Sequence, residues 1–396
     1  MITKIEVSNY RCLKTVDQPL APFQVLVGPN GSGKSTLLDV FDFLASLIQN
    51  GLEAAVRERT RNFQDLVWGR TGGSFQLALE LRLPEKNRSA VYRDRDTIRY
   101  EVTLRLDPAK EELVIENERV SLPESRRING TSQILVTHDL IIGTGPGGRG
   151  FFEETAGNAS YAFRISPQQS ALAHLPGDEA KFPAALWLKS FLEQSIQLIS
   201  LEPRALRAPA PPHKGLGIGR DGGNLPRLVS LLREARPDLF EQWVEHVRTT
   251  LPELREVRTV VRPEDQHRYI VVEYEKGATV PSWMLSDGTL RLLALTILAY
   301  TPGFCGTYLI EEPENSLHPQ AIETVFESLS SVCEGQVLIA TQSPMFVALA
   351  EPRQLLCFSR NPDGATSIVA GDQHPALEIW KREVSLGSLF ASGILG

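Results

Sequence analysis

Apolar and polar residues alternate along the first part of the chain, at residues 2–7, 75–83, 98–106 and 112–122. A period of two is typical of strands that bury one face, and polar turns separate the last three segments. We therefore predict a half-buried strand at 2–7 and an antiparallel sheet from the last three segments. Residues 23–27, FQVLV, form instead a short apolar run that leads directly into glycine, as a buried strand does when it ends in a loop.

Helical spacing of apolar residues begins directly after this loop. Leucine, phenylalanine and isoleucine recur three and four positions apart between residues 34 and 49, which predicts a helix there. From residue 166 to about 256 the spacing is again helical, including 185–199, apart from a Pro- and Gly-rich stretch at 207–224 that indicates an exposed loop. Residues 269–275, YIVVEYE, return to a strand pattern.

Helix and strand patterns alternate in the last third of the chain, at residues 289–300, 307–314, 319–333, 336–344 and 354–360. This order is typical of an α/β core with parallel strands. The sequence has no internal repeat and no sustained heptad pattern, so we expect no long coiled coil.

The composition is that of an ordinary water-soluble protein. With 42% hydrophobic and 22% charged residues, the 396-residue chain can bury the cores of two or three domains, or of one domain with large insertions. A net charge of −7 argues against a globally basic nucleic-acid-binding protein. No apolar run approaches the roughly 18 residues of a membrane helix, and the first residues lack a signal-peptide pattern, so we expect a cytoplasmic protein.

The four cysteines are widely spaced and no two of them form a C-x-x-C motif. A zinc site is therefore unsupported, and free thiols fit a reducing compartment.

A glycine-rich stretch, GPNGSGKST, joins the predicted strand at 23–27 to the predicted helix at 34–49. It fits the pattern G-x-x-x-x-G-K-[ST], in which glycines let several backbone N–H groups point at one phosphate and the helix start adds a positive dipole. We therefore predict a Walker A loop for a nucleoside triphosphate, with Lys34 on the β- and γ-phosphates and the Ser35 hydroxyl on Mg²⁺. The residues expected to contact the nucleotide are Asn30, Gly31, Ser32, Gly33, Lys34, Ser35 and Thr36.

Two adjacent carboxylates end the predicted strand in YLIEEPE, residues 308–314. An enzyme with a phosphate loop needs an acidic strand end that holds Mg²⁺ and a group that orients or deprotonates the attacking water. We assign the metal role to Glu311 and the catalytic role to Glu312. Lys34 and Glu311 are 277 residues apart, yet we expect their strands to be neighbours in the sheet.

This layout of distant Walker motifs around a large insertion resembles the ABC-type ATPase heads of the SMC, RecF and OLD groups. The resemblance implies an α/β P-loop NTPase fold with an antiparallel β lobe and a large helical insertion between Walker A and the signature motif, and it implies ATP and Mg²⁺ as cofactors. We expect a first ATPase lobe at 1–165, a mainly helical insertion or lid at 166–280, a second ATPase lobe at 281–360 and a C-terminal tail at 361–396.

The segment LSDGTLR, residues 285–291, resembles the ABC signature L-S-G-G-x, with Asp287 in place of its first glycine. On its own the segment reads equally well as the cap of a helix. In the family the signature serine and its helix N-terminus bind the γ-phosphate held by a second subunit, which implies that Ser286 and Gly288 act in trans. The chain is then expected to form a homodimer, or a higher oligomer of such dimers, around two ATP molecules.

Two further stretches resemble motifs of the same heads. PENSLHP at 313–319 stands at the place of the D-loop, with Asn315, Ser316 and His318 as polar members. QVLIATQSP at 336–344 resembles the last strand and switch loop, but Gln342 stands where the family usually has histidine. A neutral amide donates a hydrogen bond without carrying charge, so the resemblance implies slow or activator-dependent hydrolysis in which Gln342 takes part.

Two candidate contacts are carried by shorter similarities. Arg11, in NYRCLK, resembles the arginine of N-F-R-x-F in these heads and is a candidate phosphate contact. Gln168 or Gln169, in SPQQSALAHL, is the candidate Q-loop glutamine.

The segment DGGNLPRLVSLL at 221–232 resembles standalone OLD-like ATPases of bacteria, such as the ATPase subunits of the phage-defence systems PARIS and Septu. OLD proteins proper continue into a TOPRIM nuclease, whereas about 50 residues follow the switch loop here, without an acidic triad. The resemblance therefore implies a sensor or scaffold for a separate effector, a TOPRIM-like or HNH nuclease or a toxin. Alternatives are a RecF-like DNA repair ATPase, for which DNA is a possible partner, a scaffold that binds ATP without hydrolysis and, ranked last, a transporter subunit. No membrane partner is expected.

Overall fold

The structure is a computed structural model that describes residues 1–88, 95–127, 134–144, 149–152, 161–212, 217–301, 303–378, 380 and 384–395. The chain forms two compact units, each built from segments that are distant in sequence. The first unit contains residues 1–21, 31–196 and 359–368, and the second contains residues 22–30, 197–358 and 369–396. The four sequential parts expected from the sequence divide the chain by motif and remain a proposal.

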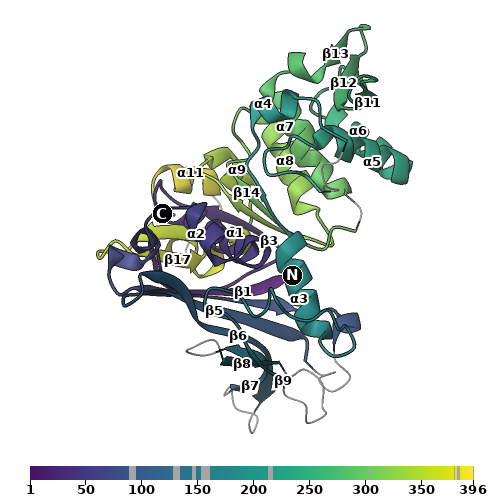
Figure 1. Ribbon diagram of the computed structural model, residues 1–396. Coiled ribbons are helices and arrows are strands. Elements are labelled where there is room, and N and C mark those ends of the chain that lie inside the picture. The colour runs from purple at the N-terminus through teal and green to yellow at the C-terminus, as the bar shows by residue number, and fades with distance from the viewer. Residues whose placement is uncertain are drawn as a thin grey trace. The chain divides into compact units, whose positions relative to one another are not determined.

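An antiparallel sheet is the framework of the first unit (Figure 1). Its strands follow the order β2-β1-β4-β5-β6-β7-β8-β9, and each described pair is antiparallel, which confirms the sheet predicted from the alternating segments. The strands are β1 (Ile2–Tyr10), β2 (Leu13–Pro19), β4 (Ser74–Arg82), β5 (Thr97–Asp107), β6 (Glu112–Arg127), β7 (Ile134–Thr144), β8 (Arg149–Phe152) and β9 (Tyr161–Arg164).

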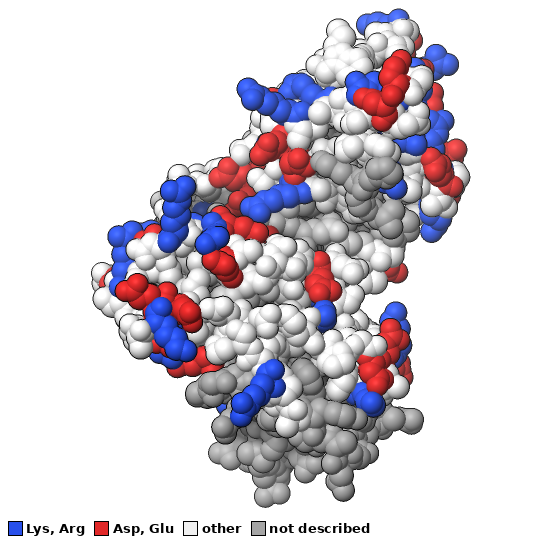
Figure 2. All heavy atoms as spheres, in the orientation of Figure 1, with Lys and Arg blue, Asp and Glu red and all other residues white. Residues whose placement is uncertain are grey.

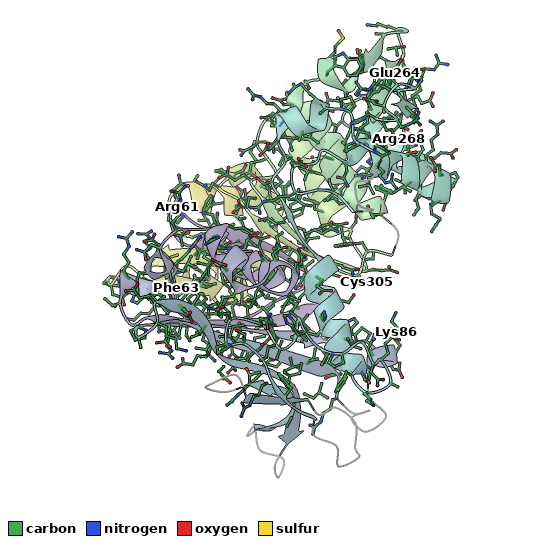
Figure 3. The ribbon with its side chains drawn as sticks, in the orientation of Figure 1. Arg61, Phe63, Lys86, Glu264, Arg268 and Cys305 are labelled. Atoms are coloured by element: carbon green, nitrogen blue, oxygen red, sulfur yellow. The ribbon has the colours of Figure 1, made fainter. Side chains whose placement is uncertain are left out.

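Helix α1 (Lys34–Asn50) packs on this sheet through aromatic side chains, and α2 (Leu52–Arg57) and α3 (Pro183–Gln194) contact the same unit. The Phe43 ring of α1 lies 5.9 Å from the Tyr10 ring and 5.7 Å from the Phe75 ring. The ring of Phe63, which Figure 3 labels, stacks on the Phe75 ring with their centroids 5.5 Å apart. Each such ring pair adds about 1 kcal/mol beyond the area it buries, so this cluster fixes the helix that follows the glycine-rich loop.

An ion pair across the sheet links β1 to β5. Arg99 Nη2 lies 2.6 Å from Glu6 Oε2 and 3.1 Å from Glu101 Oε2. The Arg99 side chain is mostly buried. The hydrogen bond from Arg99, helped by Lys4, lowers the pKa of Glu6 to about 2, although partial burial opposes this shift.

This pair predicts a stability change with a defined pH range. A carboxyl group whose pKa is lower in the folded state stabilises the fold above its unfolded pKa of 4.5, and this contribution is lost as the pH falls to about 2. We expect Glu6→Gln to lower the free energy of unfolding by about 1 kcal/mol at pH 7, and the difference from wild type to shrink between these two pH values. Denaturant unfolding at several pH values measures it. Glu53→Gln, which removes an exposed pair with Arg57, is the control and should change little.

A mainly parallel sheet is the core of the second unit. Its strand order is β10-β14-β15-β3-β16-β17. The strands are β3 (Phe23–Val27), β10 (Ile196–Ile199), β14 (Thr307–Glu311), β15 (Gln336–Ala340), β16 (Leu355–Arg360) and β17 (Thr366–Ala370). The pairs β14–β15, β15–β3 and β3–β16 are parallel, which confirms the prediction from the last third of the chain.

The expectation that the strands of Lys34 and Glu311 are neighbours is wrong. Strand β15 lies between β3 and β14, with Ile339 opposite Val25 on one side and Ile310 on the other. All five residues of β15 are buried, so the backbone N–H and C=O groups that point to its two edges cannot bond to water. They need a neighbouring strand on each side, which gives β15 its place between β14 and β3. The ends of three parallel strands therefore contribute to one edge of the sheet.

A small antiparallel sheet and several helices complete the second unit (Figure 1). The sheet contains β11 (Leu254–Val261), β12 (Arg268–Tyr274) and β13 (Thr279–Pro281). Arg268 on β12 joins it to α5 by donating to Ser230 Oγ at 2.5 Å (Figure 3). The helices are α4 (Pro203–Arg207), α5 (Leu225–Ala235), α6 (Pro237–Arg248), α7 (Asp287–Thr296), α8 (Pro319–Ser330), α9 (Pro344–Leu349), α10 (Pro375–Glu378) and α11 (Leu386–Ala391).

The end of one predicted helix is a strand, and a second strand begins where the predicted helical region ends. Residues Ile196–Ile199 continue the apolar spacing of α3 but pair with the edge of β14, and Leu254–Val261, which start near the predicted boundary at about residue 256, pair with β12. Both segments are rich in β-branched and other apolar residues, so pairing with a sheet overrides a weak local helical pattern. In the described part of the chain, no helix combines the length and apolar character needed to cross a bilayer.

Candidate nucleotide-binding site

The glycine-rich loop has the local structure that the sequence predicts: β3 ends at Val27 and α1 begins at Lys34. Gly33 caps the helix in the left-handed region at φ 111°, and a Cβ atom on it would lie 2.3 Å from Thr366 Oγ1. Glycine is therefore required at this position for both conformation and space. The N–H groups at the start of α1 belong to the predicted phosphate-binding loop.

The side chains of the loop differ in exposure in a way that fits a triphosphate. Lys34 is buried, and Ser35 is exposed. The buried Ser32 hydroxyl has no hydrogen-bond partner in the part of the chain that the structure describes. A buried polar atom without a partner is costly, so its place in this loop suits a polar ligand. The exposed Ser35 hydroxyl is of the type that binds Mg²⁺ beside a nucleotide.

The acidic motif lies at the end of β14, where Glu311 is the last strand residue and Glu312 follows it. Glu312 has φ 45°, an uncommon value for a residue with a side chain, and its N–H donates to the Ala340 carbonyl. Such backbone strain costs on the order of 1 kcal/mol and often marks a functional position.

Two amides hold the Glu312 carboxylate. Gln342 Nε2 donates to Glu312 Oε1 at 2.8 Å, and Asn315 Nδ2 donates to Oε2 at 2.7 Å. The switch-loop residue and the D-loop residue thus fix both oxygens of the predicted base. The sequence predicted a role for Gln342 in catalysis, and the structure gives it this contact within the described residues.

This contact predicts that Gln342 acts through Glu312. We expect Gln342→Leu to lower kcat for ATP hydrolysis about tenfold with little change in KM, because the base loses one of the two donors that orient its carboxylate. Asn315→Leu removes the other donor and should have the same signature. Steady-state phosphate release measures both. A raised KM with unchanged kcat would show instead that Gln342 acts on nucleotide binding.

Glu314 is a site residue that the sequence did not identify. Its Oε1 atom accepts from Thr341 Oγ1 at 2.5 Å and from the Gln342 N–H at 3.3 Å. The carboxylate therefore joins the D-loop to the switch loop and fixes the backbone from which Gln342 reaches Glu312. The third glutamate of EEPE was the available signal, but its partners are 27 and 28 residues away.

The signature segment forms the start of α7, with Ser286 as its N-cap. Ser286 is exposed, and its Oγ accepts from the Thr289 N–H at 3.1 Å. A Cβ atom on Gly288 would lie 2.7 Å from the Ser316 carbonyl oxygen, so glycine lets the signature helix contact the D-loop. The helix-cap interpretation is therefore confirmed, and it is compatible with an anion site.

A cavity of about 540 Å³ adjoins this helix start. The exposed His318 caps α8 there through a 3.3 Å hydrogen bond from Gln320 N–H to its Nδ1. Two helix N-termini thus open into one cavity, which suits a negatively charged group. Its lining residues are Thr250, Leu251, Ser286, Asp287, Gly288, Thr289, Leu292, Ser316, His318, Gln320 and Ala321.

Asp287, which replaces the first glycine of the signature, forms an ion pair with Arg207 on α4. Arg207 also donates to the Leu285 carbonyl at 3.1 Å, and its own carbonyl accepts from Ser282 Oγ. The signature is therefore held to α4 by contacts on both sides of Ser286. Sequence reasoning missed Arg207 because nothing in the local pattern connects residues that are 80 positions apart.

The two candidates from shorter similarities have different outcomes. Arg11 lies 3.1 Å from Asp39 on α1, and its role toward phosphate remains a prediction. Gln168 and Gln169 line a cavity with Asn50, at the C-terminal end of α1. A 17-residue helix is about 25 Å long, so these glutamines lie far from the loop at its other end and do not form a Q-loop.

Residues 23–348 match the sequence profile of a family described as "AAA domain, putative AbiEii toxin, Type IV TA system". An OLD nuclease of Thermus scotoductus (strain ATCC 700910 / SA-01) is 46% identical over 44 residues, which span 11% of this chain and 8% of that protein.

Two solved structures have a similar fold. One is the SmcHead bound to the C-winged helix domain of ScpA, with a TM-score of 0.56 and 16% identity over 93% of this chain and 96% of that chain. The other is an Smc head domain with an extended coiled coil, bound to the C-terminal domain of ScpA from Pyrococcus furiosus; its TM-score is 0.51, with 15% identity over 93% and 95% of the chains. The α/β P-loop NTPase fold of an ABC-ATPase head, expected from the motifs, is thereby confirmed.

Proposed function

Because the chain belongs to the family described as "AAA domain, putative AbiEii toxin, Type IV TA system", we propose that it is an ATPase that binds ATP and Mg²⁺ in the glycine-rich loop. The observation that carries this proposal is the Glu312 carboxylate, held at both oxygens at the end of a buried parallel strand. A base fixed in this way is suited to water activation.

Each residue of the site has a defined part in this proposal. Lys34 and the N–H groups at the start of α1 bind the phosphates, and the Ser35 hydroxyl and Glu311 hold Mg²⁺, which would neutralise charge on the transferred phosphoryl group. Glu312 accepts a proton from the attacking water, while Gln342 and Asn315 keep its carboxylate oriented. The neutral Gln342 adds no positive charge, so we expect slow turnover.

The proposed active assembly is a homodimer in which Ser286 and Gly288 complete the site of the second chain. Support comes from the exposed helix N-terminus at Ser286 and the adjoining cavity, which suit a phosphate but lie on a different element from the glycine-rich loop. One chain has one such loop and one signature, and a two-fold dimer pairs each with the other.

The direct test is nucleotide binding and phosphate release by the purified chain, with its oligomeric state measured with and without ATP. We expect ATP to bind, to be hydrolysed slowly and to promote dimers. Absence of binding would remove the proposed function, and binding without any phosphate release would leave the alternative of an ATP-bound scaffold.

For the biological role, we propose a sensor or scaffold that controls a separate effector, a nuclease or toxin, in defence against phage. The family description mentions a toxin and a type IV toxin–antitoxin system, and the short match is to an OLD nuclease. Phage plating on bacteria that express the chain with its neighbouring genes tests this role. We expect protection with the wild type and none with Lys34→Ala, and equal plating with both would refute the role.

The alternative function is that of a RecF-like ATPase whose partner is DNA. Figure 2 shows acidic and basic side chains interspersed on the face in view, which does not favour an extended phosphate-binding groove there. Measuring the affinity for DNA at several salt concentrations distinguishes the RecF-like function from the defence role. A protein that neutralises DNA phosphates releases counterions, so its affinity for DNA should fall steeply as the salt concentration rises.

A further inference from the structure

Two side chains that follow the switch loop in the sequence donate hydrogen bonds to backbone carbonyls of the glycine-rich loop. Strand β16 runs parallel to β3, with Cys357 opposite Val27, so it advances in the direction of that loop. Three residues later, Arg360 Nε donates to the Gly31 carbonyl at 2.8 Å. Thr366 Oγ1, at the start of β17, donates to the next carbonyl, that of Ser32, also at 2.8 Å. Arg360, the last residue of β16, and Thr366, the first residue of β17, lie in segment 359–368, which belongs to the first unit, as Gly31 and Ser32 do.

These contacts determine where two N–H groups of the loop point. In a trans peptide the C=O and the following N–H lie in one plane and point in opposite directions. Since Arg360 holds the Gly31 carbonyl, the Ser32 N–H points away from Arg360. For the same reason the Gly33 N–H points away from Thr366. Neither N–H donates a hydrogen bond within the described residues, although Ser32 and Gly33 are buried.

From this geometry we infer that Arg360 and Thr366 are positioning residues of the nucleotide site. They hold the peptide planes of the loop so that the Ser32 and Gly33 N–H groups are directed at the phosphates before a nucleotide binds. Preorganised donors bind more tightly because their ordering cost is already met. The inference rests on the proposed function. It concerns the end of β16, the start of β17 and the turn between them, which lie outside the motifs on which that function was argued.

The expected effect is a loss of affinity shared by all nucleotides that carry the phosphates held by the loop. We expect Arg360→Gln and Thr366→Val each to weaken binding of ATP and of ADP by the same factor, about fivefold, as one orienting hydrogen bond is lost. Arg360→Lys should recover part of the affinity, because a lysine donates to a carbonyl without the fixed geometry of guanidinium. Calorimetric titration of the full chain with each nucleotide and Mg²⁺ measures this.

The controls separate positioning from charge and from folding. Lys14 on β2 forms an ion pair with Asp363, which lies between Arg360 and Thr366 in the sequence. Lys14→Gln therefore also removes one positive charge near this turn, and it should leave the affinities for ATP and ADP unchanged. Arg360 is exposed, so Arg360→Gln tests the inference even where the buried Thr366→Val change alters thermal unfolding.

Two results would overturn the inference alone, and two more would overturn the proposed function with it. A larger loss for ATP than for ADP would indicate a direct contact of Arg360 with the γ-phosphate, and unchanged affinities for Arg360→Gln would show that the loop is ordered without it. If Lys34→Ala binds nucleotide like the wild type, or the wild type binds none, the proposed function fails as well. If Lys34→Ala loses nucleotide affinity and Arg360→Gln does not, only the positioning role is refuted.

Discussion

Phosphate release by the Glu312→Gln protein is expected to fall by about 10²–10³-fold, while its ATP-bound dimer accumulates. Glutamine has the shape of glutamate but accepts no proton from water at neutral pH. It also offers one acceptor oxygen in place of two, so one of the donors Gln342 and Asn315 loses its partner. ATP binding does not need this group, because the phosphates are bound elsewhere.

Single-turnover phosphate release and light scattering with ATP measure the two parts of this expectation. Glu323→Gln, which changes an exposed glutamate on α8, is the matched control and should behave like the wild type. Equal phosphate release by the wild type and the Glu312→Gln protein would refute the hydrolysis proposal and favour an ATP-bound scaffold. If the Glu312→Gln protein loses hydrolysis as expected but forms no ATP-bound dimer, only the proposed dimer is refuted.

Mixing two inactive proteins is expected to restore hydrolysis if each site is completed in trans. Lys34→Ala damages the phosphate loop, and Ser286→Arg places a large cation at a helix N-terminus, where the dipole opposes it. In a mixed dimer, one site combines both defects and the other has none. An equal mixture therefore recovers at most about a quarter of the wild-type rate, since half of the dimers are mixed and each has one intact site.

The same mixture gives a clear contradictory outcome. If mixed dimers form, as shown by co-purification of two tags, and the rate stays at the level of the single variants, the site is not composed in trans. Ser330→Arg, an arginine at the exposed end of α8, is the control for the added charge and should hydrolyse ATP alone.

The sequence predicted the elements whose pattern is local. The strand at 23–27, the helix that begins at Lys34 and the strand that ends at Glu311 are all where spacing and glycine placement indicated. These features depend on residues within a few positions of one another, and periodicity reports such dependence directly.

Features that depend on distant residues were missed or wrong. The central place of β15 and the pairing of Ile196–Ile199 follow from competition between strands for buried positions. Arg360 contacts Gly31 across 329 residues, and Arg207 holds Asp287 across 80. No local pattern specifies such a partner, so these contacts became visible only in the fold. The Q-loop assignment failed for the same reason.

The contact between Gly288 and the Ser316 carbonyl has a consequence for how a dimer responds to ATP. Ser316 follows Asn315, whose amide holds Glu312. In the proposed dimer, a phosphate that settles against the signature of one chain would press on the residue next to the one that orients that chain's own base. Occupancy of either site would then alter the rate at the other, so the dependence of hydrolysis on ATP concentration would depart from a simple hyperbola.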